Sequence, residues 1–196
     1  MGSSVFQAAV LALQAGELTL SERFFTHLTE SLSPLEAAQL GRVALDLNEP
    51  HIAVMIGKRA ASSGITIPAP YYAVHDLAKT KHPIATEFAL AIARRESEFD
   101  PVVISGAGAR GLMQVMPATA KNVAGELGID YAKEKLTADW RYNAKLGTAY
   151  LARLEKQFGG NPIMMAAGYN AGPGRPVRWM DVYGDPRQGE IDIVDW

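Results

Sequence analysis

The sequence contains no cysteine, and this absence excludes several kinds of chemistry at once. Without cysteine the chain cannot form disulfides, use a thiolate nucleophile or bind zinc through sulfur. The absence is compatible with oxidising and with reducing compartments, so it does not decide between them. The four histidines, His27, His51, His75 and His82, include no i, i+4 pair. A zinc site built on histidine is therefore not expected either.

The sequence also lacks a surplus of charge of either sign and any long apolar run. Its 19 basic and 21 acidic residues give a formal net charge of −2, so no basic excess points to nucleic acid. No run approaches the roughly 20 apolar residues that cross a bilayer, so we expect no transmembrane segment. The first residues, MGSSVFQ, carry no charged region ahead of an apolar core, and we find no secretory signal peptide in this chain.

Common motifs for nucleotide binding and serine hydrolysis are missing as well. The sequence has neither a P-loop nor a nucleophile elbow. The segment from Gly106 to Gly111 fits G-x-G-x-x-G, but it follows a predicted helix and not a strand, so we reject a dinucleotide site. Glycines at these positions instead predict a loop whose backbone approaches another surface closely.

The chain has a high content of apolar residues and clear helix boundaries. Apolar residues make up 48% of the 196 positions, which is enough for a sizeable core. Ser33 and Pro34 predict a helix start, with serine as the N-cap and proline at the first helical position. Strand signals are few, one short extended piece at 102–104 being the best, so we predict a mainly α fold. The predicted helices cover residues 5–15, 21–31, 34–47, 50–63, 84–99, 117–127, 139–158 and 162–171.

Two regions of the chain differ in character. Residues 1–67 predict short helices joined by tight turns, which is typical of helical hairpins, although no residue-level repeat occurs at a fixed period. The prolines of segment 66–72 (TIPAPYY) predict a linker, because proline cannot continue a helix. We therefore predict a second, mostly helical domain at residues 68–196.

Glu96 is the strongest candidate for a catalytic residue. The apolar side chains of the helix at 84–99 recur at helical spacing, and Glu96 falls next on the same stripe. A carboxyl that is turned inward loses hydration, which raises its pKa and keeps it protonated, as a general acid requires. The alternative is a glutamate at a helix end that reaches water or a neighbouring arginine.

Three polar residues near glycine-rich segments are further candidates. Gln114 lies between apolar neighbours, so its amide is either a clamp on the preceding loop or a partner for ligand hydroxyls. Tyr169 is either a site residue or a core aromatic with its hydroxyl at the surface. Asn170 is either a site residue or part of a helix C-cap formed with Gly172.

Two sequence blocks carry a specific resemblance. The first has Glu96-Ser97-x-Phe99-x-Pro101 followed by SGAGARGLMQxMP from Ser105 to Pro117, and the second has YNAGPG from Tyr169 to Gly174 and then Arg178-Trp179. Together they resemble the catalytic domain of the soluble lytic transglycosylases. The resemblance implies a lysozyme-like (goose-type) domain at 68–196, truncated at its C-terminus. It implies that residues 1–67 are hairpins from the end of a superhelical, solenoid-type region.

The resemblance also implies an activity. It is cleavage of the β-1,4 bond between N-acetylmuramic acid and N-acetylglucosamine in peptidoglycan glycan strands, with formation of a 1,6-anhydromuramic product. Glu96 would act first as the acid and then as the base, and no second catalytic carboxylate is evident in the motifs. The residues that would line the cleft are Ser105, Gln114, Met116, Tyr169 and Asn170. Neither a metal nor an organic cofactor is implied, and a periplasmic location and a monomer are expected.

The sequence leaves two other functions open. One is a goose-type muramidase that hydrolyses the same bond, and the other is a non-catalytic fragment that binds peptidoglycan. The second alternative is favoured by the end of the chain at Trp196, where the family normally continues. A further departure is Gly168, which stands where the family more often has alanine.

Overall fold

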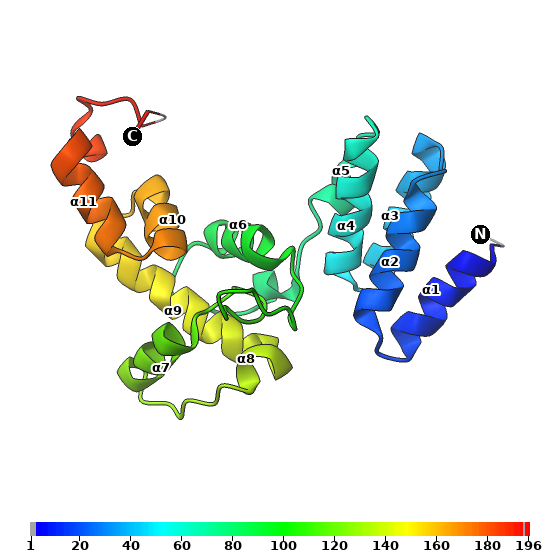
Figure 1. Cartoon of the computed structure of the whole chain (residues 1–196), viewed down its shortest axis with the longest axis horizontal. Coiled ribbons are helices and arrows are strands. Elements are labelled where there is room, and N and C mark those ends of the chain that lie inside the picture. Colours follow the sequence, from blue (N-terminus) through cyan, green and yellow to red (C-terminus); the bar gives the residue numbers. More distant parts are fainter. Residues whose placement is uncertain (1–2, 194) are drawn as a thin grey trace. The chain divides into compact units, whose positions relative to one another are not determined.

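The computed structural model describes residues 3–193 and 195–196 and divides into two compact units. The first unit extends to His75 and the second begins at Asp76. Residues 68–75, which the sequence analysis assigned to the second domain, thus lie in the first unit. The prediction of a mainly α fold is confirmed, since the described residues form helices and no named strand (Figure 1).

The first unit contains five helices whose starts follow the sequence punctuation. They are α1 (Ser4–Gln14), α2 (Leu18–Thr29), α3 (Pro34–Asp46), α4 (Pro50–Ser62) and α5 (Pro68–Tyr71). At the start of α3 the Ser33 hydroxyl accepts a hydrogen bond from the backbone N–H of Glu36. The Glu36 carboxylate in turn accepts one from the N–H of Ser33. This capping box satisfies backbone donors that the helix itself leaves unpaired, so the predicted start is confirmed.

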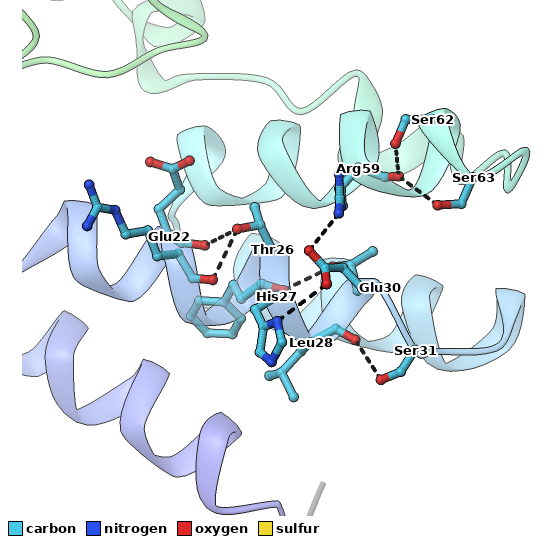
Figure 2. Close-up of polar contacts among 12 residues, drawn as sticks. Glu22, Thr26, His27, Leu28, Glu30, Ser31, Arg59, Ser62 and Ser63 are labelled. Carbon is cyan, nitrogen blue, oxygen red and sulfur yellow. Dashed lines mark hydrogen bonds and ion pairs between the residues drawn. The ribbon is translucent and has the colours of Figure 1, made fainter.

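Helices α2 and α4 are joined by apolar packing and by a surface ion pair. Phe25 of α2 and Ile52 and Ile56 of α4 are completely buried, and the apolar area that they remove from water stabilises the unit. At the surface, Arg59 of α4 lies 2.6 Å from the carboxylate of Glu30 in the turn after α2, as Figure 2 shows. Both partners are exposed, so this pair contributes little to stability.

The segment expected to be a linker contains helix α5. Pro68 occupies the first helical position, where the missing N–H of proline has no intrahelical partner to lose. Two glycines allow α5 to approach its neighbours. A Cβ at Gly57 would lie 2.6 Å from the Cα of Tyr71, and one at Gly41 would lie 2.8 Å from the Cβ of Pro70. The linker prediction was therefore wrong, because close packing stabilises this short turn of helix.

The second unit is organised around its longest helix. Its elements are η1 (Asp76–Lys79), α6 (Thr86–Ser97), α7 (Pro117–Glu126), α8 (Lys135–Ala138), α9 (Trp140–Phe158), α10 (Pro162–Ala171), α11 (Gly174–Tyr183) and η2 (Pro186–Gln188). Helix α9 packs against α7, α8 and α10. Its buried face includes Leu146, Leu151, Leu154 and Phe158. None of the described helices is long and apolar enough to cross a membrane.

Two parts of the second unit differ from the sequence prediction. Helices α8 and α11 were not predicted, since one is a single turn and the other follows a Gly-Pro-Gly segment that commonly ends a helix. The extended piece predicted at 102–104 forms no strand in the described chain. Ile104 makes only an isolated bridge to Arg110, because the glycine loop folds back on itself after a few residues.

Candidate active site

Glu96 lies in the last turn of α6, at the point where the chain leaves the helix. Ala89, Ile92 and Ala93 of the same face are buried, and Glu96 is half-buried beyond them. The helix ends because Glu98 adopts a left-handed backbone, with φ of 48°. The predicted inward orientation of Glu96 therefore follows from its position at the end of the apolar stripe.

A cavity of about 540 Å³ opens beside this carboxyl. One wall comes from α6 and the other from α10, which is built from small residues at this point. The lining residues are Ile92, Arg95, Glu96, Ala166, Ala167 and Asn170. The side chains of α10 at this point are two alanines, whose methyl groups fill little of the cavity, so space remains for a ligand beside Glu96. The cavity lies entirely within the second unit.

The environment of Glu96 favours the protonated carboxyl. Burial raises the pKa of Glu96 above its ordinary value, and the positive charge of Arg95 opposes this shift only in part. No group among the described residues donates a hydrogen bond to this carboxylate, so nothing else stabilises its charged form. A carboxyl with a raised pKa beside a cavity can give a proton to a ligand and later take one back.

The glycine-rich loop that follows α6 is held by a dense set of backbone contacts. Arg110 and Val115 exchange two backbone hydrogen bonds, and the N–H of Gly111 donates to the carbonyl of Val103 at 2.8 Å. The Ser105 hydroxyl accepts a hydrogen bond from the N–H of Ala109 at 3.0 Å. Ser105, a predicted cleft residue, thus also holds the loop in shape.

Gly111 is required for close approach of this loop to α8 and α9. Its φ is +69°, and a Cβ here would meet the carbonyl oxygen of Leu136 and lie 2.7 Å from the side-chain nitrogen of Asn143. Glycine alone adopts this backbone without crowding those atoms. The sequence prediction of close backbone approach is correct at this position.

Asn143 is a positioning residue to which the sequence, where it is only one of the positions that match the family, assigned no role in the site. Its side chain is completely buried in α9 and accepts a hydrogen bond from the N–H of Met113 at 2.9 Å. Its amide nitrogen donates to the carbonyls of Arg110 at 2.7 Å and Leu136 at 2.9 Å. The available signal was an amide on the apolar stripe of the helix at 139–158, which must have buried partners.

Gln114 and Tyr169 fix the end of the same loop. The Gln114 amide donates to the carbonyls of Val103 at 3.1 Å and Gly111 at 3.0 Å, so the clamp role considered for it is present. The Tyr169 hydroxyl donates to the carbonyl of Met113 at 2.7 Å. Burial and the nearby charge of Glu96 raise the pKa of Tyr169 well above its ordinary value, so the phenol keeps the proton that it donates.

The predicted site residues thus fall into two groups. Glu96 and Asn170 line the cavity directly. Ser105, Gln114 and Tyr169 make hydrogen bonds to the loop backbone, and Tyr169 is close enough to Glu96 for the charge of that carboxylate to affect its pKa. Met116 is the N-cap residue of α7, and it is 42% exposed. Its side chain belongs to neither group, since it lines no part of this cavity and makes no hydrogen bond to the loop backbone.

The described residues contain no group of three histidine, aspartate or glutamate side chains placed to hold a metal ion. Within the described lining of the cavity, Glu96 is the one carboxylate. The chemistry that this arrangement supports directly is proton transfer by a single carboxyl.

The second unit matches a known protein family. The Transglycosylase SLT domain matches residues 74–190. The soluble lytic murein transglycosylase of Escherichia coli is 36% identical over 174 residues, which cover 87% of this chain and 26% of that protein. This chain therefore spans about a quarter of the length of that curated relative.

Solved structures agree with this match. The 70 kDa soluble lytic transglycosylase of Escherichia coli has a TM-score of 0.79 and 30% identity, covering 91% of this chain and 30% of that one. The lytic transglycosylase Slt of Pseudomonas aeruginosa, solved as an inactive mutant with glutamine in place of one glutamate, has a TM-score of 0.72 and 28% identity. It covers the same shares of the two chains. These likenesses confirm the predicted lysozyme-like lytic transglycosylase fold.

Proposed function

This chain belongs to the Transglycosylase SLT domain family, and on that basis we propose that its second unit cleaves peptidoglycan glycan strands. The bond is the β-1,4 link from N-acetylmuramic acid to N-acetylglucosamine, and the product carries a 1,6-anhydromuramic end. The observation that carries the proposal is the half-buried Glu96, with its raised pKa, at the edge of a cavity of about 540 Å³.

Glu96 acts twice in the proposed reaction. As the acid, it gives its proton to the glycosidic oxygen while the bond from that oxygen to the anomeric carbon breaks. The oxygen of the 2-acetamido group of the substrate stabilises the positive charge that develops on this carbon. The muramic 6-hydroxyl then attacks the anomeric carbon, and ionised Glu96 takes the hydroxyl proton. The enzyme ends in its starting state, and no water is consumed.

A single carboxylate in the lining supports this route over ordinary glycoside hydrolysis. Retaining and inverting glycosidases use two flanking carboxyl groups, one of which acts as a nucleophile or activates water. Among the described lining residues of this cavity, Glu96 is the one carboxylate. The substrate must therefore supply the second function itself, as its acetamido and hydroxyl groups do in the proposed steps.

The other predicted residues shape the cleft around this carboxyl. Asn170 lines the cavity and is exposed, so its amide is placed to hydrogen-bond a sugar hydroxyl or acetamido group. Gln114, Ser105 and Tyr169 hold the loop that follows α6, and Met116 presents an exposed apolar side chain at the end of that loop. We assign all five to the cleft as part of the proposal.

Product analysis by mass spectrometry tests the proposed reaction. We expect purified peptidoglycan digested with the protein to release anhydromuramic ends, whereas a goose-type muramidase would release reducing ends. We expect Glu96→Gln to lower the rate at least about 100-fold, since it removes the general acid. Glu87→Gln, an exposed exchange in the first turn of the same helix, is the matched control and should keep full activity.

Two results would contradict the assignment. Equal rates for the wild type and Glu96→Gln would remove Glu96 from the reaction. Binding of peptidoglycan without any cleavage would favour the non-catalytic alternative.

We extend the proposal to the setting of the protein. Its relatives are named for murein, and murein lies in the periplasm, so we propose a periplasmic location. We further propose that the protein is a monomer. We also propose that the helical hairpins of the first unit belong to a superhelical region. Cell fractionation and sedimentation analysis test the first two points.

A further inference from the structure

The cavity beside Glu96 is lined by one cationic side chain from the part of the chain that the structure describes. Arg95 lies next to Glu96 in α6 and lines the same cavity, and it is exposed to solvent. No described carboxylate lies within ion-pair distance of its guanidinium. By contrast, Arg59 and Arg153 are each paired with a carboxylate at the protein surface. Arg95 thus brings a positive charge to the proposed cleft that no carboxylate of the described residues pairs with.

The surroundings of Arg95 suit an anionic ligand. The rest of the lining consists of Ile92, two alanines of α10 and Asn170, none of which carries charge. When Glu96 is protonated, as the acid step requires, the charge of the lining is +1. A guanidinium presents its N–H groups as a planar fork that matches the two oxygens of a carboxylate.

We propose that Arg95 binds a carboxylate carried by the muramic residue of the substrate. This inference rests on the proposed function, because it names the part of the glycan strand that the site recognises. The carboxylate has two sources. In peptide-free strands it belongs to the lactyl group of muramic acid, and in peptide-bearing strands it belongs to the attached peptide.

Such binding would be coupled to the protonation of Glu96. The positive charge of Arg95 lowers the pKa of Glu96, against the effect of burial. A carboxylate bound to Arg95 offsets that charge and so raises the pKa of Glu96. By linkage, the protein with protonated Glu96 binds the carboxylate more tightly than the ionised form does. The substrate thereby keeps the general acid protonated.

The test compares four strands with four proteins. Two strands are peptide-bearing and peptide-free with their carboxylates free, and the other two are the same strands with the carboxylates converted to neutral methylamides. The proteins are the wild type, Arg95→Gln, Arg95→Lys and Arg153→Gln. The last is the matched control, because Arg153 is an exposed arginine that does not line this cavity.

We expect neutralisation of the carboxylates to lower kcat/KM of the wild type roughly tenfold. Arg95→Gln should cleave charged and neutral strands at about the same rate, Arg95→Lys should keep part of the preference, and Arg153→Gln should keep all of it. If neutralisation slows cleavage of the peptide-free strand, the bound carboxylate is that of the lactyl group. If it slows cleavage of the peptide-bearing strand, the bound carboxylate is that of the peptide. A full preference retained by Arg95→Gln would overturn the proposal.

A pH profile separates this role from a structural one. On the neutral strand, Arg95→Gln should move the basic limb of kcat/KM to higher pH than in the wild type, because the pKa of Glu96 rises when the cation is removed. A variant that is only destabilised would have a lower kcat/KM at every pH, and the basic limb of its profile would not move. An unchanged basic limb would contradict the coupling.

A binding measurement separates failure of this inference from failure of the proposed function. Calorimetry with Glu96→Gln, which cannot cleave by the proposed route, gives affinities for charged and neutral disaccharide fragments. We expect roughly tenfold tighter binding of the charged fragment, lost when Arg95→Gln is added. Absence of anhydromuramic product from the wild type would reject the proposed function, whereas equal affinities here would reject the role of Arg95.

Discussion

The hydroxyl of Tyr169 in α10 donates a hydrogen bond to the backbone carbonyl of Met113, 2.7 Å away in the loop that follows α6. The Met113 N–H is itself bound by Asn143 of α9. One backbone residue therefore joins the glycine loop to two helices. Because α10 also forms a wall of the cavity beside Glu96, the position of this wall and that of the loop depend on each other.

We expect Tyr169→Phe to lower the free energy of unfolding by about 1–2 kcal/mol, since it leaves the buried carbonyl of Met113 without this donor. Urea unfolding measures the loss, and hydrogen exchange of the loop amides should become faster. Tyr150→Phe is the control, because the Tyr150 ring packs 5.5 Å from the ring of Tyr169 and its hydroxyl makes no hydrogen bond described here. Equal losses in the two variants would show that the bond to Met113 has no special role.

We expect Asn143→Ala to be severely destabilising, by about 3 kcal/mol or more, because the buried Met113 N–H and Leu136 carbonyl lose this partner. The Arg110 carbonyl would keep only its hydrogen bond from the N–H of Val115. Thr148→Val in the same helix is the comparison, since its buried hydroxyl bonds only to carbonyls of the preceding turn. We expect that exchange to change stability by about 1 kcal/mol or less. Thermal unfolding of both variants measures these losses of stability. Similar decreases in melting temperature for the two variants would contradict the anchoring role of Asn143.

We expect Gly168→Ala to be destabilising by about 1 kcal/mol in this chain, although alanine is a better helix former than glycine. A Cβ at this position would lie 2.8 Å from the ring of buried Phe158 and 3.2 Å from the side chain of Leu154. In a Phe158→Leu background the same exchange should become neutral or stabilising. A double-mutant cycle measures the coupling, and a coupling near zero would show that Phe158 is not the reason for glycine here.

We expect Glu96→Gln to be more stable than the wild type at pH 7. Burial raises the folded pKa of Glu96, so ionisation of this carboxyl costs more in the folded state than in the unfolded state. The stability tied to its protonation is fully present below the unfolded pKa and is lost as the pH rises through the folded one. The two proteins should therefore have similar melting temperatures at pH 3.5, with a gap that opens as the pH rises. A difference in melting temperature that stays the same from pH 3.5 to pH 7 would show that ionisation of Glu96 is not its cause.

Most of the secondary structure could be predicted because its signals are local. The starts of α3 and α9 depend on Ser33 and Asp139, whose side chains bind backbone groups within three residues. The end of α9 depends on Gly159, whose φ is +63°. Helix α5 was missed because its stability depends on close packing against Gly41 and Gly57, which no local signal reports.

The sequence by itself determined which residue could act as the acid. The position of Glu96 follows from the helical period of α6, a property of its own segment. The tertiary structure alone decided the cavity wall from α10, the anchoring of the loop by Asn143 and the bond from Tyr169 to Met113. These last contacts join residues 30 and 56 positions apart. Partners at such separations are chosen by how α9 and α10 pack and not by neighbours along the chain, so no local pattern could specify them.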